Sequence, residues 1–245
     1  MIAPLVRRCV AEFIGTAFLL AAIVGSGIAA VRLSPGQIGL QLLENSLITG
    51  AALVALILAL QPVSAAFNPI VTLVERALGA LTNGEAAALV AAQIAGAAIG
   101  SVVANLMFHL PAVTIATHHR TGGGLWLGEV VATLGLLIVI FGTVRSGRAN
   151  LVAFAVGAYI SAAYWFTSST SFANPAVTIA RTLSNTFAGI APASVVMFVL
   201  MQLLGGVLGY GVIRALYPNA NQLAADIADG DGRDTPATVQ AKEYA

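Results

Sequence analysis

The sequence is short of charge. Only 9% of its 245 residues are Asp, Glu, Lys or Arg, whereas 58% are hydrophobic. A soluble domain carries about 25% charged residues, so this composition excludes an ordinary soluble protein and indicates a membrane protein. The formal net charge of +1 excludes a nucleic-acid-binding surface. The one cysteine, Cys9, excludes an internal disulfide.

Catalytic patterns are also missing from the sequence. It shows no nucleophile–base pair, no phosphate-binding loop and no cluster of metal ligands. The acidic run within residues 215–245 lacks the regular ligand spacing of a calcium loop. We therefore expect no enzymatic activity, no cofactor and no metal site.

The sequence contains instead six long apolar runs, each near the ~20 residues that span a bilayer. These runs cover 10–31, 42–61, 86–108, 125–144, 150–167 and 192–214. Two shorter segments, 68–78 and 174–184, lie outside them. Residues 215–245 are polar, and we expect them to form a disordered cytoplasmic tail.

The two halves of the sequence resemble each other. Three segments recur in the same order: 12–20 as 129–137, 68–73 as 174–179, and 93–100 as 202–209. Each half holds three full spans. Because three is an odd number, the second half enters the membrane upside down relative to the first. The sequence thus predicts an all-α membrane protein with six transmembrane helices and two re-entrant half-helices in an inverted repeat. This domain covers 1–214, with halves at about 8–110 and 125–214.

The most specific of these repeats is an Asn-Pro motif. Its two copies are Asn68-Pro69-Ile70 and Asn174-Pro175-Ala176. Asn caps the free N–H groups of a helix start, and Pro fits the first helical position. Ten residues of helix measure about 15 Å, so two such segments that meet by their N-termini fill the ~30 Å core of a bilayer. We expect both motifs at the midplane of a pore, where two positive helix ends repel cations.

Four polar side chains lie inside apolar spans at matching places: Glu12, Glu129, Gln93 and Gln202. Carboxylates within a membrane are costly and usually mark function. One interpretation is a proton-coupling pair, Glu12 and Glu129. The interpretation that we favour is structural: each Glu accepts hydrogen bonds from backbone N–H groups of the irregular loop in its own half. The two Gln residues are expected to hold the same loops.

The distribution of arginine predicts the orientation. With the N-terminus inside, most arginines outside the tail lie at cytoplasmic ends of the spans. These are Arg7, Arg8, Arg76, Arg145, Arg148 and Arg214. Because positive residues concentrate on the cytoplasmic side, we expect a multi-pass protein of the cell inner (cytoplasmic) membrane with both termini in the cytoplasm.

The doubled Asn-Pro motif within six spans, together with Glu12 and Glu129, resembles the aquaporin and aquaglyceroporin (major intrinsic protein) superfamily over about residues 8–214. The resemblance implies an aquaporin-like right-handed bundle, a homotetramer with one pore per subunit, no cofactor, and passive flux of water or small neutral solutes. An ion- or proton-coupled secondary transporter that uses Glu12 and Glu129 stays open as an alternative, because inverted repeats and broken helices build those too. A structural or adhesive membrane protein with a closed pore is a third possibility, which the short loops disfavour.

The resemblance also places a selectivity filter. By spacing from the two motifs, its four positions correspond to Ile48, Ala162, Ser171 and Val177. Water-selective members resemble a Phe, His, small residue, Arg pattern at these positions, and glycerol-type members keep the Arg. This sequence has no Arg, His or aromatic residue there, which predicts a wider and uncharged filter. We interpret Arg181 as a cap on the outer end of its half-helix rather than as a filter residue.

A valine in place of the filter arginine looks like the bacterial aquaglyceroporin-like channels that are encoded with arsenic-resistance genes. That resemblance implies glycerol-like polyols, arsenous acid and methylated arsenicals as solutes, with some water. Ile70, which replaces Ala in the first motif, adds bulk near the midplane, on a side that the sequence does not specify.

Overall fold

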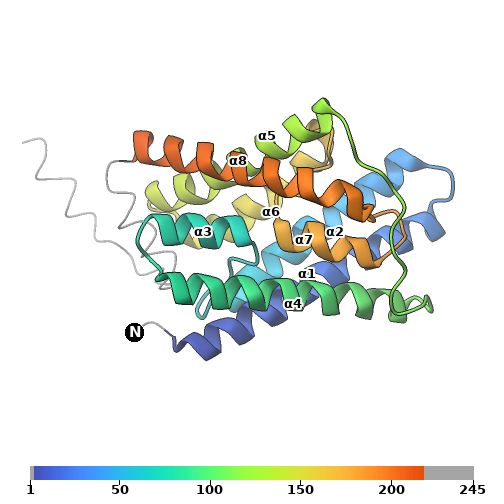
Figure 1. Ribbon diagram of the computed structural model, residues 1–245, viewed down its shortest axis with the longest axis horizontal. Helices are drawn as coiled ribbons and strands as arrows, with labels where there is room; N and C mark the ends of the chain where they lie inside the picture. The colour runs from blue at the N-terminus through green and yellow to red at the C-terminus, as the bar shows by residue number, and fades with distance from the viewer. Residues whose placement is uncertain (1–2, 218–245) are drawn as a thin grey trace, which may run out of the picture.

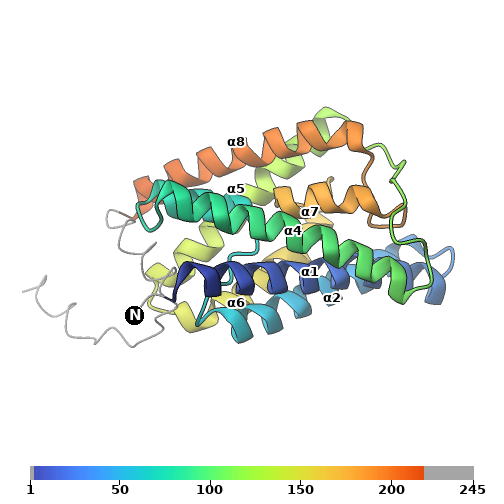
Figure 2. The same ribbon diagram turned by 60° about the horizontal axis from the view of Figure 1, so that its bottom comes forward.

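The computed structural model describes residues 3–217, and its elements over that range are helices (Figures 1 and 2). Six of them are long and apolar enough to cross a membrane. They are α1 (Leu5–Leu33), α2 (Ile38–Leu60), α4 (Asn83–Met107), α5 (Gly123–Arg145), α6 (Val152–Phe166) with the 3-10 turn Ala149–Leu151 before it, and α8 (Pro192–Leu216). The predicted all-α fold with six spans is confirmed. The tail expected at 215–245 starts inside α8, and its residues 218–245 lie outside the described part of the chain.

Two short helices complete the bundle. They are α3 (Pro69–Ala77) and α7 (Pro175–Ala180), and a 3-10 turn, Arg181–Leu183, extends α7. Figure 1 shows α3 toward the end of the bundle that holds the N-terminus, and α7 toward the opposite end. We call these the α3 end and the α7 end of the molecule. The predicted pair of half-helices, inserted from opposite ends, is confirmed.

Each half-helix starts where its Asn-Pro motif places it. Asn68 Oδ1 accepts a hydrogen bond from the Ile70 N–H at 2.9 Å, and Asn174 Oδ1 accepts one from the Ala176 N–H at 3.0 Å. In both cases Pro occupies the first helical position, where no N–H is needed. The motif therefore works as a helix start twice, once in each half.

The inverted repeat also decides which helices pack closely. The helix α1 packs along α4, and their counterparts α5 and α8 pack in the same way. A Cβ at Gly96 would overlap the Phe13 carbonyl oxygen, and a Cβ at Gly205 would lie 2.7 Å from the Val130 carbonyl oxygen. Because these positions lack a side chain, the helix backbones approach closely, and the two pairs form rigid walls around the half-helices.

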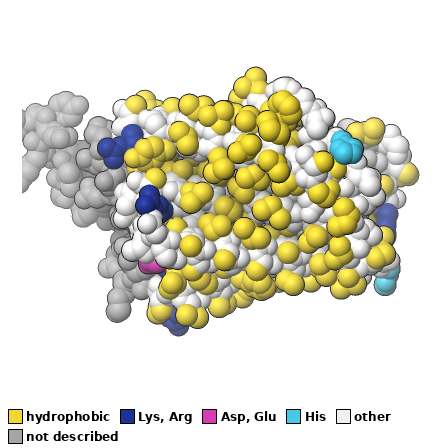
Figure 3. Space-filling model, viewed as in Figure 1, with side chains coloured by type: hydrophobic (Ala, Val, Ile, Leu, Met, Phe, Trp, Pro, Cys, Tyr) yellow, Lys and Arg dark blue, Asp and Glu magenta, His cyan; other side chains and the backbone are white. Residues whose placement is uncertain are grey.

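The surface of the bundle matches a bilayer. Figure 3 shows hydrophobic side chains over the middle of the visible face, with Lys and Arg side chains gathered near the α3 end. Large apolar residues such as Phe18, Val196 and Val207 are exposed on the long helices. A soluble protein rarely exposes so much contiguous apolar surface, whereas acyl chains cover it at no cost.

Candidate functional site

The two half-helices meet by their N-terminal ends in the middle of the molecule. The Asn68 side-chain NH₂ donates to the Ala173 carbonyl oxygen at 2.8 Å, and the Asn174 NH₂ donates to the Phe67 carbonyl oxygen at 2.7 Å. Each asparagine therefore caps its own helix with Oδ1 and bonds the opposite loop with its NH₂. Both asparagines also line the central cavity of the molecule, as the motif predicts.

The residue before each asparagine has an unusual backbone conformation. Phe67 and Ala173 both have φ of 47°, in the left-handed region that non-glycine residues rarely adopt. This conformation turns their carbonyl groups toward the opposite asparagine. Such a residue costs on the order of 1–3 kcal/mol and persists only when its surroundings hold it. Two buried carboxylates provide that support.

In the first half the carboxylate is Glu12, which is fully buried on α1. It accepts hydrogen bonds from the Ala66 N–H at 2.8 Å, from the Phe67 N–H at 2.7 Å and from the Ser64 hydroxyl at 2.5 Å. The Gln93 side chain on α4 donates to the same carboxylate at 2.8 Å. A carboxylate with this many donors is stable without water, so Glu12 fixes the loop that leads into α3.

The second half repeats the arrangement around Glu129 on α5. Its carboxylate accepts hydrogen bonds from the N–H groups of Phe172 and Ala173, both at 2.9 Å. The Gln202 side chain on α8 donates to Glu129 at 2.5 Å and to the Thr178 hydroxyl at 2.8 Å. The structure thus places Glu12, Glu129, Gln93 and Gln202 where the structural interpretation expects them. Neither carboxylate lines the central cavity.

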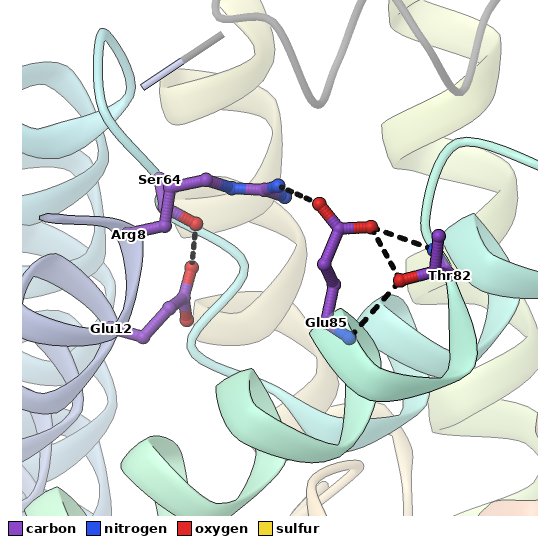
Figure 4. Close-up of polar contacts among 5 residues, drawn as sticks. All are labelled: Arg8, Glu12, Ser64, Thr82 and Glu85. Carbon is purple, nitrogen blue, oxygen red and sulfur yellow. Dashed lines mark hydrogen bonds and ion pairs between the residues drawn. The ribbon is translucent and has the colours of Figure 1, made fainter. Parts of the chain in front are cut away.

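Figure 4 shows the hydrogen bond from Ser64 to Glu12 and, beside it, a separate group formed by Arg8, Glu85 and Thr82. An Arg8 terminal nitrogen lies 3.5 Å from a Glu85 carboxylate oxygen. Glu85 in turn accepts hydrogen bonds from the N–H and hydroxyl of Thr82, which caps α4. This ion pair ties the start of α1 to the start of α4 and fixes Arg8 beside the cavity.

The cavity runs between the two ends of the molecule past the paired motifs. At the α3 end it is lined by Arg8, Gln61 and Glu75; in the middle by Asn68 and Asn174; and at the α7 end by Thr49, Tyr164, Ser171, Val177 and Arg181. Between these polar groups the walls are apolar, with Leu53 and Ile57 among the lining residues. The cavity thus has polar groups at intervals along apolar walls. Such a lining suits a small solute that exchanges one hydrogen bond for another as it moves.

The structure contradicts two of the four filter positions carried over by spacing. Ile48 is 46% exposed on the outside of α2, and Ala162 is exposed on the outside of α6. Neither lines the cavity. Their places are taken by Thr49 and Tyr164, whose hydroxyl oxygens lie 3.2 Å apart. The physical reason is helical geometry, since each residue along a helix turns the side chain by 100°.

Ser171 and Val177 do line the cavity, and both are buried. They come from the second loop and from α7, close to the motif from which they were counted. Because both residues lie within three positions of Asn174, their places relative to the motif are well determined by the sequence. At the α7 end Thr49, Tyr164, Ser171 and Val177 all line the cavity, and we call these four residues the neck.

The interpretation of Arg181 as a surface cap is wrong. Its side chain is only 2% exposed and lines the cavity. Its guanidinium carbon lies 3.5 Å from the centre of the Phe172 ring, and its Nε donates to the Ala188 carbonyl oxygen. The short length of α7 and the 3-10 turn after it keep Arg181 inside the bundle. Glu75 lines the cavity seven residues after Asn68, so the repeat itself carried a signal for both residues.

Ile70 lies away from the cavity. It is buried against α8, where a Cβ on Gly206 would lie 2.9 Å from the Ile70 Cγ2. The missing side chain at Gly206 accommodates the larger residue of the first motif. The bulk of Ile70 is thus absorbed by helix packing rather than by the solute path.

Comparisons with known proteins agree with this geometry. The profile of the family described as Major intrinsic protein matches residues 2–168 and 145–241. The aquaglyceroporin AqpS of Rhizobium meliloti (strain 1021) is 48% identical over 220 residues, which are 89% of this chain and 94% of that protein. The aquaporin AqpM of Methanothermobacter thermautotrophicus is 34% identical over 169 residues, which are 59% of this chain and 68% of that protein.

The fold has a solved counterpart as well. The X-ray structure of the aquaglyceroporin from Plasmodium falciparum superposes with a TM-score of 0.68 at 19% identity, and the match covers 89% of this chain and all of that one. The paired half-helices, the loop-holding carboxylates and the family match lead to one conclusion. The chain belongs to the major intrinsic protein family, whose members are membrane channels for small solutes.

Proposed function

We propose that this channel passes small neutral solutes through a neck that is wide and uncharged: glycerol-like polyols, arsenous acid and methylated arsenicals, with some water. The observation that carries the proposal is Val177. It is a buried lining residue three positions after Asn174, where the family resemblance expects an arginine. A valine offers neither charge nor donors and is shorter than arginine, so the neck admits larger solutes with an apolar side.

The similarity to AqpS supports the solute class. That protein is described as an aquaglyceroporin, and it matches nearly the whole of this chain. The neck adds a physical reason, because Thr49, Tyr164 and Ser171 carry hydroxyl groups and Val177 offers an apolar contact to the same cavity. Polyols and arsenous acid carry several hydroxyl groups on a small frame and fit such a mixed surface.

The alternative of a proton-coupled transporter has less support. Glu12 and Glu129 would be its coupling residues, yet both carboxylates bond the N–H groups of the loops and neither lines the cavity. A coupling residue has to exchange protons with the solute path. Hydrogen-bonded burial behind the loops favours a structural role for both.

The test is stopped-flow flux in liposomes that contain the purified protein, with protein-free liposomes as the control. The panel is water, glycerol, urea, trivalent arsenic as arsenous acid, and a methylated trivalent arsenical. We expect downhill flux of the polyol and the arsenicals, with weak temperature dependence and no response to a pH gradient. Uphill accumulation driven by a pH gradient would show the transporter instead, and absence of flux for the whole panel would contradict the channel proposal.

We further propose a homotetramer in the cell inner membrane with both termini in the cytoplasm, which makes the α3 end cytoplasmic and the α7 end external. The gathering of Lys and Arg near the α3 end supports this orientation (Figure 3). In a Cys9→Ser background, a cysteine at the exposed His119 should react with an impermeant maleimide on intact cells, and one at the exposed Ser146 should not. The reverse pattern would invert the assignment. Cross-linking in membranes tests the tetramer.

A further inference from the structure

The two half-helices carry ionisable residues of opposite type at the same position of the repeat. Arg181 lies seven residues after Asn174, and Glu75 lies seven residues after Asn68. Both side chains are buried, with exposed fractions of 2% and 5%, and both line the cavity. The residue three positions after each asparagine is instead the same in both halves. It is Val71 in the first half and Val177 in the second, and both valines line the cavity. The halves therefore agree near the midplane and differ at the two mouths.

Arg181 lies on the same side of its half-helix as the neck valine. The two residues are four apart, which is about one turn of helix, and both line the cavity. The charge that the family resemblance places at position 177 is thus absent there and present one turn closer to the α7 end. The neck and the charge are two separate residues in this chain.

No carboxylate in the described part of the chain lies within 4 Å of the Arg181 guanidinium. Among residues 3–217 the ion pair found within 4 Å is Arg8–Glu85 at the other end of the molecule. Arg181 is held by the Phe172 ring and the Ala188 carbonyl oxygen, and the Arg120 guanidinium lies 5.1 Å from the centre of the same ring. Two arginines at one ring, neither of them in an ion pair within 4 Å among the described residues, make this mouth electropositive, and a low-dielectric wall strengthens their field.

Ser171 supplies an independent sign of a ligand at the same place. It lines the cavity and is only 3% exposed, yet its hydroxyl oxygen has no hydrogen-bond partner among the described residues. A buried hydroxyl without a partner is costly. A solute that passes the mouth can provide that partner, while the Arg181 N–H groups donate to its oxygen atoms.

We propose that Arg181 is the charge-selecting residue of this channel, acting one turn away from the neck, and that Arg181 and Ser171 form a subsite for the oxygen atoms of neutral hydroxylated solutes. The inference rests on the proposed function and deepens it. Size is selected at Val177, and charge is selected at Arg181. A cation that reaches the mouth meets a fixed positive charge before it reaches the neck, whereas a polyol or a neutral oxyacid meets donors.

The test measures K⁺ leak and glycerol flux in the same liposomes. In Arg181→Gln we expect K⁺ leak to rise about tenfold or more. Glycerol flux should fall by up to about fivefold, because donors to its oxygen atoms are lost, while the size order of a polyol series stays that of wild type, because Val177 is unchanged. Arg181→Lys keeps the charge and should keep the low leak. Glu75→Gln is the matched control, because it replaces the ionisable residue at the equivalent position of the other half and should not raise K⁺ leak.

Arg181 also holds the loop at Ala188, so a second variant guards against misfolding. Arg181→Met keeps an apolar stem against the Phe172 ring and removes the charge, and it should leak K⁺ as Arg181→Gln does. Wild-type K⁺ leak in either neutral variant, in a protein that still conducts glycerol, would overturn charge selection at Arg181. Unchanged glycerol flux in both neutral variants would overturn the subsite. Absence of glycerol flux in the wild-type protein is a different outcome, because it would overturn the proposed channel function itself.

Discussion

The two re-entrant segments are built by the same rules at their inner ends and by different rules at their outer ends. Near the midplane each has an Asn-Pro start, a left-handed residue before it, and a buried Glu–Gln–Thr group behind the loop. At the mouths one presents Glu75 and the other presents Arg181. The comparison teaches that positions which hold the loops are shared between the halves, whereas positions that face the entering solute are free to diverge.

The loop-holding carboxylates offer the strongest way to break this comparison. Changing Glu12→Gln or Glu129→Gln replaces an acceptor oxygen with an NH₂ group that faces backbone donors. We expect each change to lower the free energy of unfolding by about 3 kcal/mol, measured by denaturant unfolding in detergent. Glu44→Gln is the control, because Glu44 accepts a single hydrogen bond from Ser34 near a helix end. A selectivity change in a well-folded Glu12→Gln protein would contradict the structural role.

The neck gives the next largest effect. In Val177→Arg a longer, charged side chain enters the neck, which Thr49 and Ser171 also line. We expect the flux of methylated arsenicals and larger polyols to fall about tenfold, a barrier of roughly 1.4 kcal/mol, while water flux changes less. Val177→Thr has nearly the same shape and serves as the control. An equal loss of all solutes in Val177→Arg would mean that residue 177 does not set the size limit.

The first motif differs from the second because its Ile70 packs against Gly206, and this contact can be tested by itself. In Gly206→Ala the new Cβ meets Ile70, and we expect a loss of about 1–3 kcal/mol in the free energy of unfolding. Ile70→Ala in the same protein should restore much of that loss, which a double-mutant cycle measures. Gly211→Ala on the same helix meets nothing within 4 Å and should cost nothing. An additive cycle would show that Ile70 and Gly206 are not coupled.

The corrected filter positions predict a smaller change. Thr49→Val removes a hydroxyl that lies 3.2 Å from the Tyr164 hydroxyl, worth about 1 kcal/mol, so glycerol flux should change by up to about fivefold. Ile48→Ala alters a side chain outside the cavity and should leave flux unchanged. Flux in liposomes decides between them, and a larger effect of Ile48→Ala would return that residue to the filter.

The smallest effect concerns the connection between α4 and α5. Burial, and to a lesser extent the positive charge of Arg120, hold the pKa of His118 below its usual 6.5. The unfolded chain then binds the proton more readily, so this contribution to stability is complete above pH 6.5 and is lost as pH falls toward the lower folded pKa. NMR titration should give a pKa below 6.5 for His118 and a higher value in Arg120→Gln. A value at or above 6.5 in the wild-type protein would contradict this.

The sequence predicted the elements that depend on local chemistry. The Asn-Pro starts, the six apolar spans and the inverted order could be read directly, because each rests on a pattern within a few residues. Glu12 and Glu129 could be paired with their loops because the repeat aligns them. The same repeat pairs Glu75 with Arg181, because each lies seven residues after the asparagine of its motif.

The filter could not be predicted as well, for a geometric reason. Counting 20 residues back from Asn68 reaches Ile48, and the cavity residue is its neighbour Thr49. A one-residue error turns a side chain by 100° around the helix, which moves it from the cavity to the lipid. Ala162 and Tyr164 differ by two residues and lie on opposite sides of α6. Arg181 was misplaced because the shortness of α7 depends on tertiary packing.

The crossed hydrogen bonds between Asn68 and Ala173 and between Asn174 and Phe67 have a consequence for regulation. These bonds tie the two half-helices together. If either half-helix withdrew, a buried asparagine NH₂ group and a buried carbonyl oxygen would lose their hydrogen-bond partners. A closing motion that keeps these hydrogen bonds has to take place at the mouths of the cavity, away from Asn68 and Asn174.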